Sequence, residues 1–299
     1  MRPLLDPARL GHYDGLALGV RRGMGARPGD RRVPGRPQAS GIELEAHAPY
    51  APGDDLRHLD WNALGRLDSL LVRRFTAERE VVAHILLDTS ASLGAPAADD
   101  KLGAACELAM GLAYVALQSG DAVRLAVLGN DATVMRAPVF RQRGSIPRVA
   151  EWLGALRPGG TLGFGAAVEE HVARHPTPGV ALLISDFLMA PDEIERGVRA
   201  LRARGYEIHL LHVIGPGELD PRREFTRAML TDVESGARRA IALTEANLTR
   251  YQDALAAHLD ALRALADRHR ATYVRLVAGT EVVTLLTGDL ARAGVIRRR

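Results

Sequence analysis

The sequence has little cysteine and little lysine, and both shortages exclude chemistry. Cys106 is the only cysteine, so the chain can form neither an internal disulfide nor a zinc cage of thiolates. Lys101 is the only lysine among 39 basic residues, so a Schiff-base mechanism would have to use this side chain. The phosphate-loop pattern Gly-x-x-x-x-Gly-Lys-Ser/Thr and the zinc-protease pattern His-Glu-x-x-His are both absent. These absences exclude a P-loop nucleotidase and a zinc protease of that type.

Long apolar runs and aromatic side chains are also scarce. The longest nearly unbroken apolar stretch, at residues 109–117, is far short of the roughly 20 residues that a membrane-spanning helix needs. The first residues lack the apolar core of a secretory signal. The net charge is +3, but 36 acidic residues are interleaved with the arginines, and an aromatic content of 4% is too low for a base-stacking platform. We therefore expect a cytoplasmic protein with no membrane span and no nucleic-acid partner.

Apolar runs of strand length alternate with helical patterns from residue 81 onward. Runs of this kind are typical of strands buried on both faces of a parallel sheet, and they occur at residues 81–87, 123–128, 179–185 and 206–214. Strands that alternate with helices predict right-handed crossovers. The expected fold is α/β: a doubly wound, mostly parallel sheet flanked by helices.

The expected domain organisation has two parts. Residues 1–80 form an N-terminal segment with a weak helical pattern at its start and a flexible loop rich in Gly, Pro and Arg at 24–41. This segment is irregular from residue 42 until a strand near 70–75. Residues 81–299 form the α/β domain, interrupted by an insertion at 215–243 that is predicted to fold as a β-hairpin.

Oxygen-bearing side chains follow the predicted buried strands. The pattern Asp-x-Ser-x-Ser comes directly after the first strand, Gly-Gly-Thr opens a later helix, and Ser-Asp ends a third strand. In a doubly wound sheet these loops meet at the carboxyl edge. The residues are Asp88, Ser90, Ser92, Thr161 and Asp186.

Carboxylate and hydroxyl oxygens suit a hard cation, so this set predicts a Mg²⁺ site, with Mn²⁺ or Ca²⁺ as the other candidates. Taken alone, Asp-x-Ser-x-Ser is also explained as a polar loop in which Asp88 or Ser92 caps the next helix. Three loops that offer oxygens at the same edge strengthen the metal interpretation.

The order of these three motifs resembles a von Willebrand factor type A domain, and the matched residues correspond to its metal-ion-dependent adhesion site. Further motifs upstream resemble a narrower group, the domain of unknown function 58 (DUF58) family. They are Gly-Ile-Glu-Leu-Glu at 41–45, Tyr-Ala-Pro-Gly-Asp-Asp-Leu-Arg at 50–57, Asp-Trp at 60–61, Arg66, Val-Arg-Arg-Phe at 72–75 and Glu-Arg at 78–79. The sequence departs from the pattern at Leu93, Ser185 and Phe187, where methionine, threonine and glycine are usual. None of these departures removes a proposed oxygen ligand.

The resemblance implies a non-enzymatic adaptor that binds another protein through the metal ion. A partner would supply an acidic side chain to complete the coordination shell. Family members often accompany MoxR-type AAA+ ATPases, so such an ATPase, or its client, is the implied partner in the assembly or maturation of protein complexes. No catalytic residue is assigned.

A catalytic alternative remains open. Two strand-end carboxylates with Mg²⁺ could hydrolyse a phosphoester. A phosphatase of the haloacid dehalogenase type would have a second aspartate where Ser90 stands. An acidic nuclease would usually gather more carboxylates, and Asp99 and Asp100 are predicted to cap the helix that begins at Lys101 instead.

Two other groups of residues are candidate sites. His171 and His175 have the helical spacing of a metal-binding pair, but no third ligand is evident, and His84 is interpreted as a core residue. The block at 54–61 mixes charges with Trp61. It is interpreted as a structural ionic lock, with a recognition surface as the alternative.

Overall fold

The structure is a computed structural model of the 299-residue chain. It describes residues 4–6, 10–20, 42–52, 56, 59–67, 69–77, 81–128, 134–161, 163–221, 227–231, 238–242 and 244–299. The chain divides into two compact units, one made of Met1–Ala26 with Val81–Arg299 and the other of Arg27–Glu80. Residues 4–6 and 10–20, which the sequence pattern grouped with the rest of 1–80, thus cluster with the larger unit.

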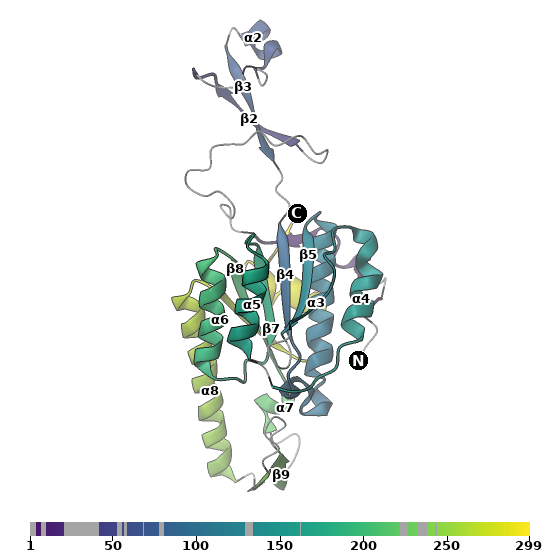
Figure 1. Cartoon of the computed structure of the whole chain (residues 1–299), viewed down its shortest axis with the longest axis vertical. Helices are drawn as coiled ribbons and strands as arrows, with labels where there is room; N and C mark the ends of the chain where they lie inside the picture. Colours follow the sequence, from purple (N-terminus) through teal and green to yellow (C-terminus); the bar gives the residue numbers. More distant parts are fainter. Residues whose placement is uncertain are drawn as a thin grey trace. The chain divides into compact units, whose positions relative to one another are not determined.

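A six-stranded sheet forms the centre of the larger unit (Figure 1). In spatial order its strands are β11 (Thr272–Val277), β8 (Glu207–Ile214), β7 (Val180–Ser185), β4 (Val82–Asp88), β5 (Ala122–Leu128) and β6 (Val134–Arg136). All neighbouring pairs are parallel except β5 and β6, which are antiparallel. The predicted mostly parallel sheet is confirmed.

Helices cover both faces of this sheet, as expected for a doubly wound arrangement. One face packs against α3 (Lys101–Gln118), α4 (Ile146–Gly154), α9 (Val282–Thr287) and α10 (Asp289–Arg292). The other face packs against α5 (Phe164–Arg174), α6 (Pro191–Ala203) and α8 (Glu245–Arg268). Side chains of β4 alternate between the two cores: Ile85 and Leu87 belong to the first and Leu86 to the second. This alternation is why the strand sequence reads as an unbroken apolar run.

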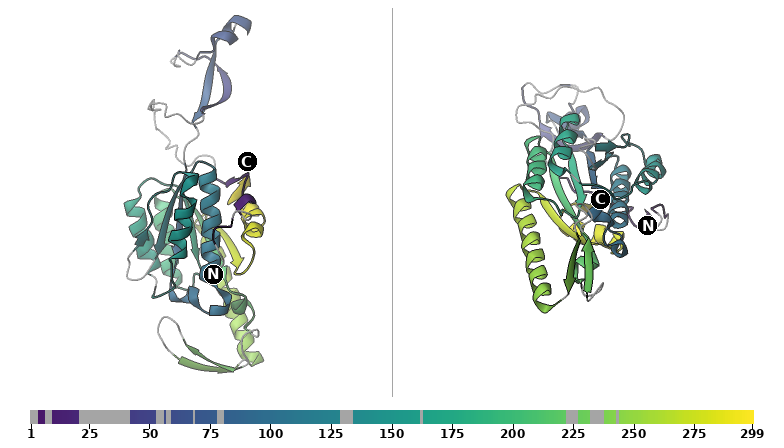
Figure 2. Two further views of the ribbon diagram at one scale, coloured as in Figure 1. Left: turned by 90° about the vertical axis from the view of Figure 1, so that its right-hand side faces the viewer. Right: turned by 60° about the horizontal axis from the view of Figure 1, so that its bottom comes forward.

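Short elements connect the larger ones. On the carboxyl side of the strands they are η2 (Ala91–Gly94), η3 (Ala97–Asp99) and α7 (Pro216–Leu219), whereas η5 (Arg143–Ser145) lies near the start of β5 and precedes α4. In the region of the predicted insertion, β9 (Arg227–Thr231) and β10 (Arg238–Ala242) pair antiparallel. The turn predicted at 235–236 lies outside the described residues. Figures 1 and 2 show this hairpin beside the N-terminal half of α8.

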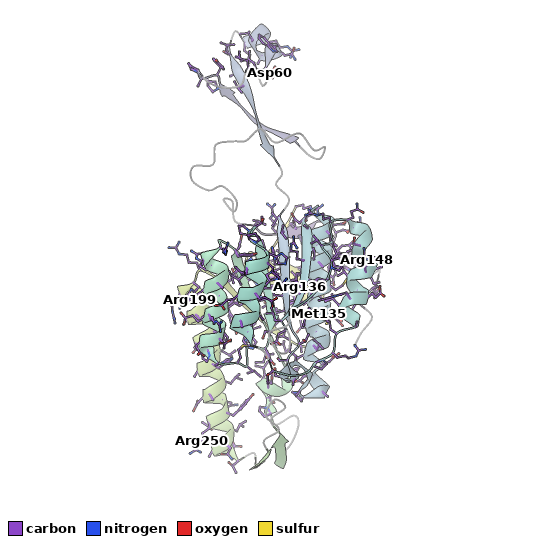
Figure 3. The ribbon with its side chains drawn as sticks, in the orientation of Figure 1. Asp60, Met135, Arg136, Arg148, Arg199 and Arg250 are labelled. Carbon is purple, nitrogen blue, oxygen red and sulfur yellow. The ribbon has the colours of Figure 1, made fainter. Side chains whose placement is uncertain are left out.

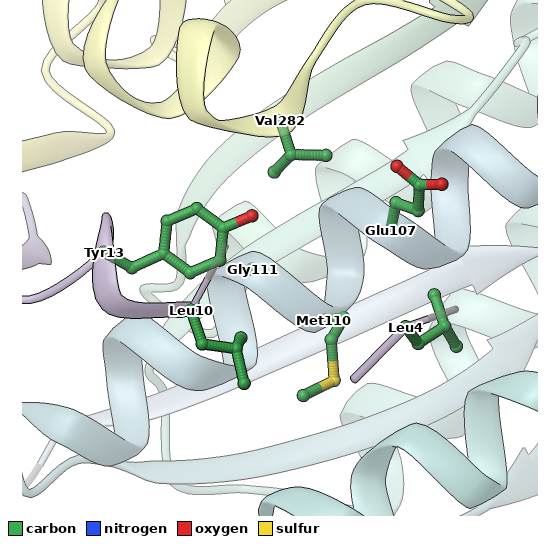
Figure 4. Close-up of a pocket in the computed structure, with 7 residues that line it drawn as sticks. All are labelled: Leu4, Leu10, Tyr13, Glu107, Met110, Gly111 and Val282. Atoms are coloured by element: carbon green, nitrogen blue, oxygen red, sulfur yellow. The ribbon is translucent and has the colours of Figure 1, made fainter. Parts of the chain in front are cut away.

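The beginning and end of the chain form a small sheet that the sequence did not predict. Strand β1 (Leu16–Leu18) pairs antiparallel with β12 (Ile296–Arg298), so the helical expectation for this part of residues 1–23 is wrong (Figure 2). Each strand has only three residues, too few to show a period of two. Before β1, Leu10 and Tyr13 line a small pocket against Met110 and Gly111 of α3 (Figure 4).

The smaller unit contains two strands and one helix, of which the sequence predicted only the strand near 70–75. Strand β2 (Ile42–Pro49) pairs antiparallel with β3 (Leu71–Ala77), and α2 (Trp61–Leu67) lies between them in sequence. Asp60 accepts hydrogen bonds from the N–H groups of Asn62 and Ala63 and so caps α2 (Figure 3). The predicted loop at 24–41 lies outside the described residues, as do most charged members of the 54–61 block. Trp61 of that block is 67% exposed.

Among the helices within the described residues, none combines the length and the apolar character needed to cross a membrane.

Close pairing of β4 with β7 gives the first testable prediction. A Cβ at Gly179, directly before β7, would lie 2.0 Å from the carbonyl oxygen of Val82 in β4. Because backbone cannot move aside cheaply in a packed sheet, Gly179→Ala should lower the free energy of unfolding by about 1–3 kcal/mol. Urea denaturation checks this, with Gly144→Ala as the control, since a Cβ at Gly144 meets nothing within 4 Å. Equal stability of the two variants would contradict the tight β4–β7 contact.

Candidate functional site

The candidate site lies where the direction of the chain crossovers reverses. From β4 the chain passes through α3 to β5 on one side, whereas from β7 it passes through α6 to β8 on the other. Strands β4 and β7 are parallel neighbours, and their register pairs Leu87 with Ile184. The next residues, Asp88 and Ser185, therefore come side by side at the carboxyl edge. Doubly wound sheets open a crevice at such a switch point.

Direct hydrogen bonds join the two strand ends. The Ser185 hydroxyl donates to Asp88 Oδ2 at 2.6 Å, and the Ser90 N–H donates to Asp88 Oδ1 at 2.7 Å. The Ser90 and Ser92 hydroxyl oxygens lie 2.9 Å apart and share a hydrogen bond. Asp88, Ser90 and Ser92 therefore form one connected group with Ser185, a residue that was not among the predicted ligands.

The loop that carries Thr161 is held against the Asp88 loop by backbone hydrogen bonds. The Gly159 N–H donates to the Thr89 carbonyl oxygen, and the Ala91 N–H donates to the Gly160 carbonyl oxygen, both at 2.9 Å. Gly160 has a φ of 70°, a left-handed conformation that glycine adopts without strain. Thr161 follows immediately and is exposed. The structure thus brings all three predicted loops together.

The carboxylates and the Ser90 hydroxyl lie at the buried side of the site, and Ser92 and Thr161 lie toward its surface. Asp88 is fully buried, Asp186 is 1% exposed and Ser90 is 4% exposed, whereas Ser92 is half-buried and Thr161 is exposed. A ligand held by these oxygens would therefore face solvent on the side of Ser92 and Thr161.

Burial of Asp88 has an electrostatic consequence. Burial, and next the charge of Asp186, raise the pKa of Asp88 from 3.8 to about 6. Hydrogen bonds from Ser185 and Ser90 oppose the rise but do not cancel it. Within the described part of the chain, no basic side chain bonds to Asp88. At neutral pH the Asp88 carboxylate therefore carries a buried negative charge to which no basic side chain of the described residues bonds.

The turn after β7 is strained. Phe187 has a φ of 49°, a left-handed conformation that is unusual for a bulky residue. Its N–H donates to the Ser185 hydroxyl at 2.8 Å, and the Leu188 N–H donates to Asp186 Oδ1 at 3.3 Å. The Phe187 side chain is fully buried. These contacts fix the direction of the Asp186 carboxylate.

Lys101 and Glu218 extend the site, and the sequence analysis missed both in this role. The Lys101 ammonium donates to Asp186 Oδ2 at 3.0 Å and to Glu218 Oε1 at 2.5 Å. Burial opposes the charge, but the two carboxylates outweigh it and raise the pKa of Lys101. The only available signal was that Lys101 is the single lysine of the sequence.

The two aspartates before α3 have different roles. Asp100 caps α3 as predicted, since its carboxylate accepts the Gly103 N–H at 3.2 Å. Asp99 accepts the Gly217 N–H instead, at 3.1 Å, and so ties α7 to the loop before α3. The prediction that both cap the helix is wrong for Asp99.

The donor set consists of hard oxygen atoms. Within the described residues, no group of three or more His, Cys, Asp or Glu side chains is arranged to hold a metal ion. A cation here would depend on hydroxyls as well as on Asp88 and Asp186, which fits Mg²⁺ better than Zn²⁺.

Three histidines gather nearer the opposite edge of the sheet. His84 Nδ1 of β4 and His171 Nε2 of α5 lie 2.9 Å apart, and the rings of His171 and His175 have centroids separated by 4.7 Å. The sequence showed no third side chain beside His171 and His175, and the structure places His84 there. Burial first, and then neighbouring imidazoles and arginines, lower the pKa of His84 to about 2 and that of His171 to about 3. The cluster is neutral at physiological pH.

Replacing the buried carboxylate gives a prediction on stability. In the unfolded chain Asp88 has its ordinary pKa of 3.8, so the folded state binds a proton more readily between pH 3.8 and about 6. Ionised Asp88 therefore lowers stability above pH 6, and this penalty disappears as the pH falls toward 4. Asp88→Asn should raise the free energy of unfolding by about 1–3 kcal/mol at pH 8 in the presence of a chelator.

Urea denaturation at pH 8 and pH 4 measures this difference, which should be large at pH 8 and vanish at pH 4. Asp253→Asn, on the exposed face of α8, is the matched control and should change nothing. An Asp88→Asn variant that is less stable than wild type at pH 8 would contradict the electrostatic interpretation.

The histidine cluster predicts sensitivity to acid. Because unfolded histidines titrate near 6.5 and folded His84 and His171 only near 2–3, the unfolded state binds more protons below pH 6.5. Stability is therefore lost as the pH falls, by about 1.4 kcal/mol per pH unit for each such group. When the free energy of unfolding is measured by urea denaturation between pH 6 and pH 4, its slope against pH should be shallower by that amount in His171→Gln. The exposed control His12→Gln should leave the slope unchanged.

Sequence comparison places the chain among proteins without an assigned function. Residues 47–261 match the family described as protein of unknown function DUF58. Uncharacterized proteins of Mycobacterium bovis and Mycobacterium tuberculosis are 31% identical over 258 residues, which is 83% of this chain and 73% of each relative.

Similar solved structures include the conserved hypothetical protein BatB from Bacteroides thetaiotaomicron, with 16% identity and a TM-score of 0.45 over 71% of this chain and 98% of that one. An aerotolerance-related membrane protein from Bacteroides fragilis has 16% identity and a TM-score of 0.44 over 71% of this chain and 99% of that one. The family match covers most of the chain, and the mycobacterial relatives align along most of its length. The chain therefore belongs to the DUF58 family.

Proposed function

We propose that this protein is a non-enzymatic adaptor that binds another protein through a divalent cation, in the manner of a von Willebrand factor type A domain. Mg²⁺ is the proposed cation, and Mn²⁺ or Ca²⁺ could replace it. The residues that would hold it are Asp88, Ser90, Ser92, Thr161 and Asp186. The observation that carries the proposal is the buried Asp88 carboxylate, which faces Asp186 and hydroxyl groups and bonds to no basic side chain in the described residues.

Charge balance supports a divalent ion. Asp88, Asp186 and Glu218 bring three carboxylates to this edge of the sheet, and Lys101 supplies one positive charge. Two negative charges therefore remain to be neutralised when all three carboxylates are ionised. A bound Mg²⁺ would supply this charge and attract a further carboxylate from outside.

The position of the hydroxyls supports recognition of a partner. Ser92 is half-buried and Thr161 is exposed, so the outer side of the site is open to a second protein. An Asp or Glu side chain of the partner would complete the coordination shell there. Such charge-assisted contacts are stronger than neutral hydrogen bonds.

Binding is proposed in preference to turnover because the proposed cation ligands include only two carboxylates, Asp88 and Asp186, beside neutral hydroxyls. The thiol of Cys106 offers no nucleophile, since burial raises its pKa to about 12. We propose a MoxR-type AAA+ ATPase or its client as the partner, in the cytoplasm and in assembly or maturation of protein complexes. This choice of partner rests on the family resemblance alone.

The test combines calorimetry with affinity capture. Wild-type protein should bind Mg²⁺, and Asp88→Ala should bind it at least about tenfold more weakly because a negatively charged oxygen ligand is lost. The variant should keep its fold by circular dichroism, since it loses a buried charge. Partner proteins captured by the wild type in Mg²⁺ should be absent in EDTA and with Asp88→Ala, but present with Asp253→Ala.

Two results would contradict the proposal. Partner binding that is unchanged in EDTA and in Asp88→Ala would show that no cation mediates it. Mg²⁺-dependent hydrolysis of p-nitrophenyl phosphate that is lost in Asp88→Ala and Asp186→Ala would replace the adaptor with a phosphoester hydrolase.

A further inference from the structure

Lys101 is the single lysine in a chain with 38 arginines, and its side chain is fully buried. It is the first residue of α3, and its ammonium bonds to carboxylates of two other segments, Asp186 after β7 and Glu218 in α7. One nitrogen atom therefore serves two acceptors that are far apart in sequence.

Replacement of this lysine by arginine would change the contact. A guanidinium is a planar fork that binds both oxygens of a carboxylate, whereas an ammonium is a compact charge that contacts one. Lys101 reaches only Oδ2 of Asp186, and Oδ1 accepts the Leu188 N–H at 3.3 Å. The lysine thus leaves one oxygen of Asp186 without a cationic neighbour.

The oxygens of Asp88 are engaged in a similar way. Oδ1 accepts from the Ser90 N–H and Oδ2 from the Ser185 hydroxyl. Each carboxylate is therefore held so that both of its oxygens are engaged by protein donors, which disfavours binding a cation with both oxygens at once. Ca²⁺ takes six to eight ligands and commonly uses both oxygens of a carboxylate, whereas Mg²⁺ takes six and retains water.

We propose that Lys101 is a positioning residue that sets the cation preference of the site, an inference that rests on the proposed function. By holding Oδ2 of Asp186, it confines that carboxylate to one oxygen and favours a small six-coordinate ion, Mg²⁺ or Mn²⁺, over Ca²⁺. It also links the site to α7, because the second carboxylate on its ammonium belongs to Glu218.

The contacts around Glu218 show how firmly this arrangement is built. Its other oxygen, Oε2, accepts the Gly215 N–H at 2.7 Å, and its carbonyl oxygen accepts from the Tyr251 hydroxyl of α8 at 2.6 Å. Glu218 is therefore fixed from two sides, and it fixes Lys101 in turn. Movement of Lys101 away from Asp186 would have to break this network.

The experiment is calorimetric titration of the full chain with MgCl₂, MnCl₂ and CaCl₂, compared with the variant Lys101→Met. Methionine keeps an unbranched side chain one heavy atom shorter than lysine and removes the charge. In wild type, Mg²⁺ and Mn²⁺ should bind more tightly than Ca²⁺. In Lys101→Met, the ratio of Ca²⁺ to Mg²⁺ affinity should rise at least about tenfold, because Oδ2 of Asp186 is released from the ammonium and both oxygens of this carboxylate then lack a cationic neighbour. A purely structural role would weaken all ions alike and leave this ratio unchanged.

Two further variants keep the test decisive if Lys101→Met does not fold. Glu218→Gln leaves the ammonium on Asp186, so its ion preference should match wild type within about twofold. Lys101→Arg keeps the buried charge but offers a fork that covers both Asp186 oxygens, so Mg²⁺ affinity should fall at least about tenfold.

The outcomes separate the two proposals. Wild type that binds no divalent cation would overturn the proposed function and this inference with it. A second set of results would overturn only the role of Lys101. In these, wild type binds Mg²⁺ through Asp88, but Lys101→Met has the same ion preference as wild type, or Lys101→Arg has the same Mg²⁺ affinity as wild type.

Discussion

The parallel pairing of β4 with β7 is the constraint on which the site depends. Its register fixes Asp88 beside Ser185, and the reversal of the crossovers leaves these two strand ends uncovered by a connecting helix. Every other contact of the site is built outward from that pair. The turn at Phe187 then aims Asp186 at the same place, although its left-handed backbone is unfavourable for a bulky side chain. The fold thus keeps strain and buried charge at one edge, where a ligand could offset them.

Strand β4 carries ionisable groups at its two ends, a neutral histidine near its beginning and a buried carboxylate at its end. Near its beginning, His84 is held neutral by burial and by the surrounding imidazoles and arginines. At its end, Asp88 is buried beside a second carboxylate, which leaves negative charge to be balanced. The apolar residues between them belong to two separate cores and separate the two polar clusters. One strand therefore positions a neutral cluster that serves packing and a charged cluster that is suited to binding.

The sequence was sufficient for the central sheet and for the loops of the candidate site. Unbroken apolar runs predict buried strands such as β4, and residues after such strands meet at the carboxyl edge without knowledge of side-chain contacts. The three-residue strands β1 and β12 could not be predicted, because they are too short to show a period and pair across almost the whole chain. The contact between Lys101 and Glu218 spans 117 residues, and that between His84 and His171 spans 87. Such pairs follow from tertiary packing, which local patterns do not encode.

The burial of Lys101 also bears on how complexes of this protein can be mapped. Cross-linking reagents that join proteins through side-chain amines need an accessible lysine, and the one lysine of this chain has no exposed surface. Contacts with other proteins would leave no lysine-derived bridge in a mass spectrum, however extensive the interface. Carboxylate-directed reagents, which can address the many surface Asp and Glu side chains, are the appropriate choice for this chain.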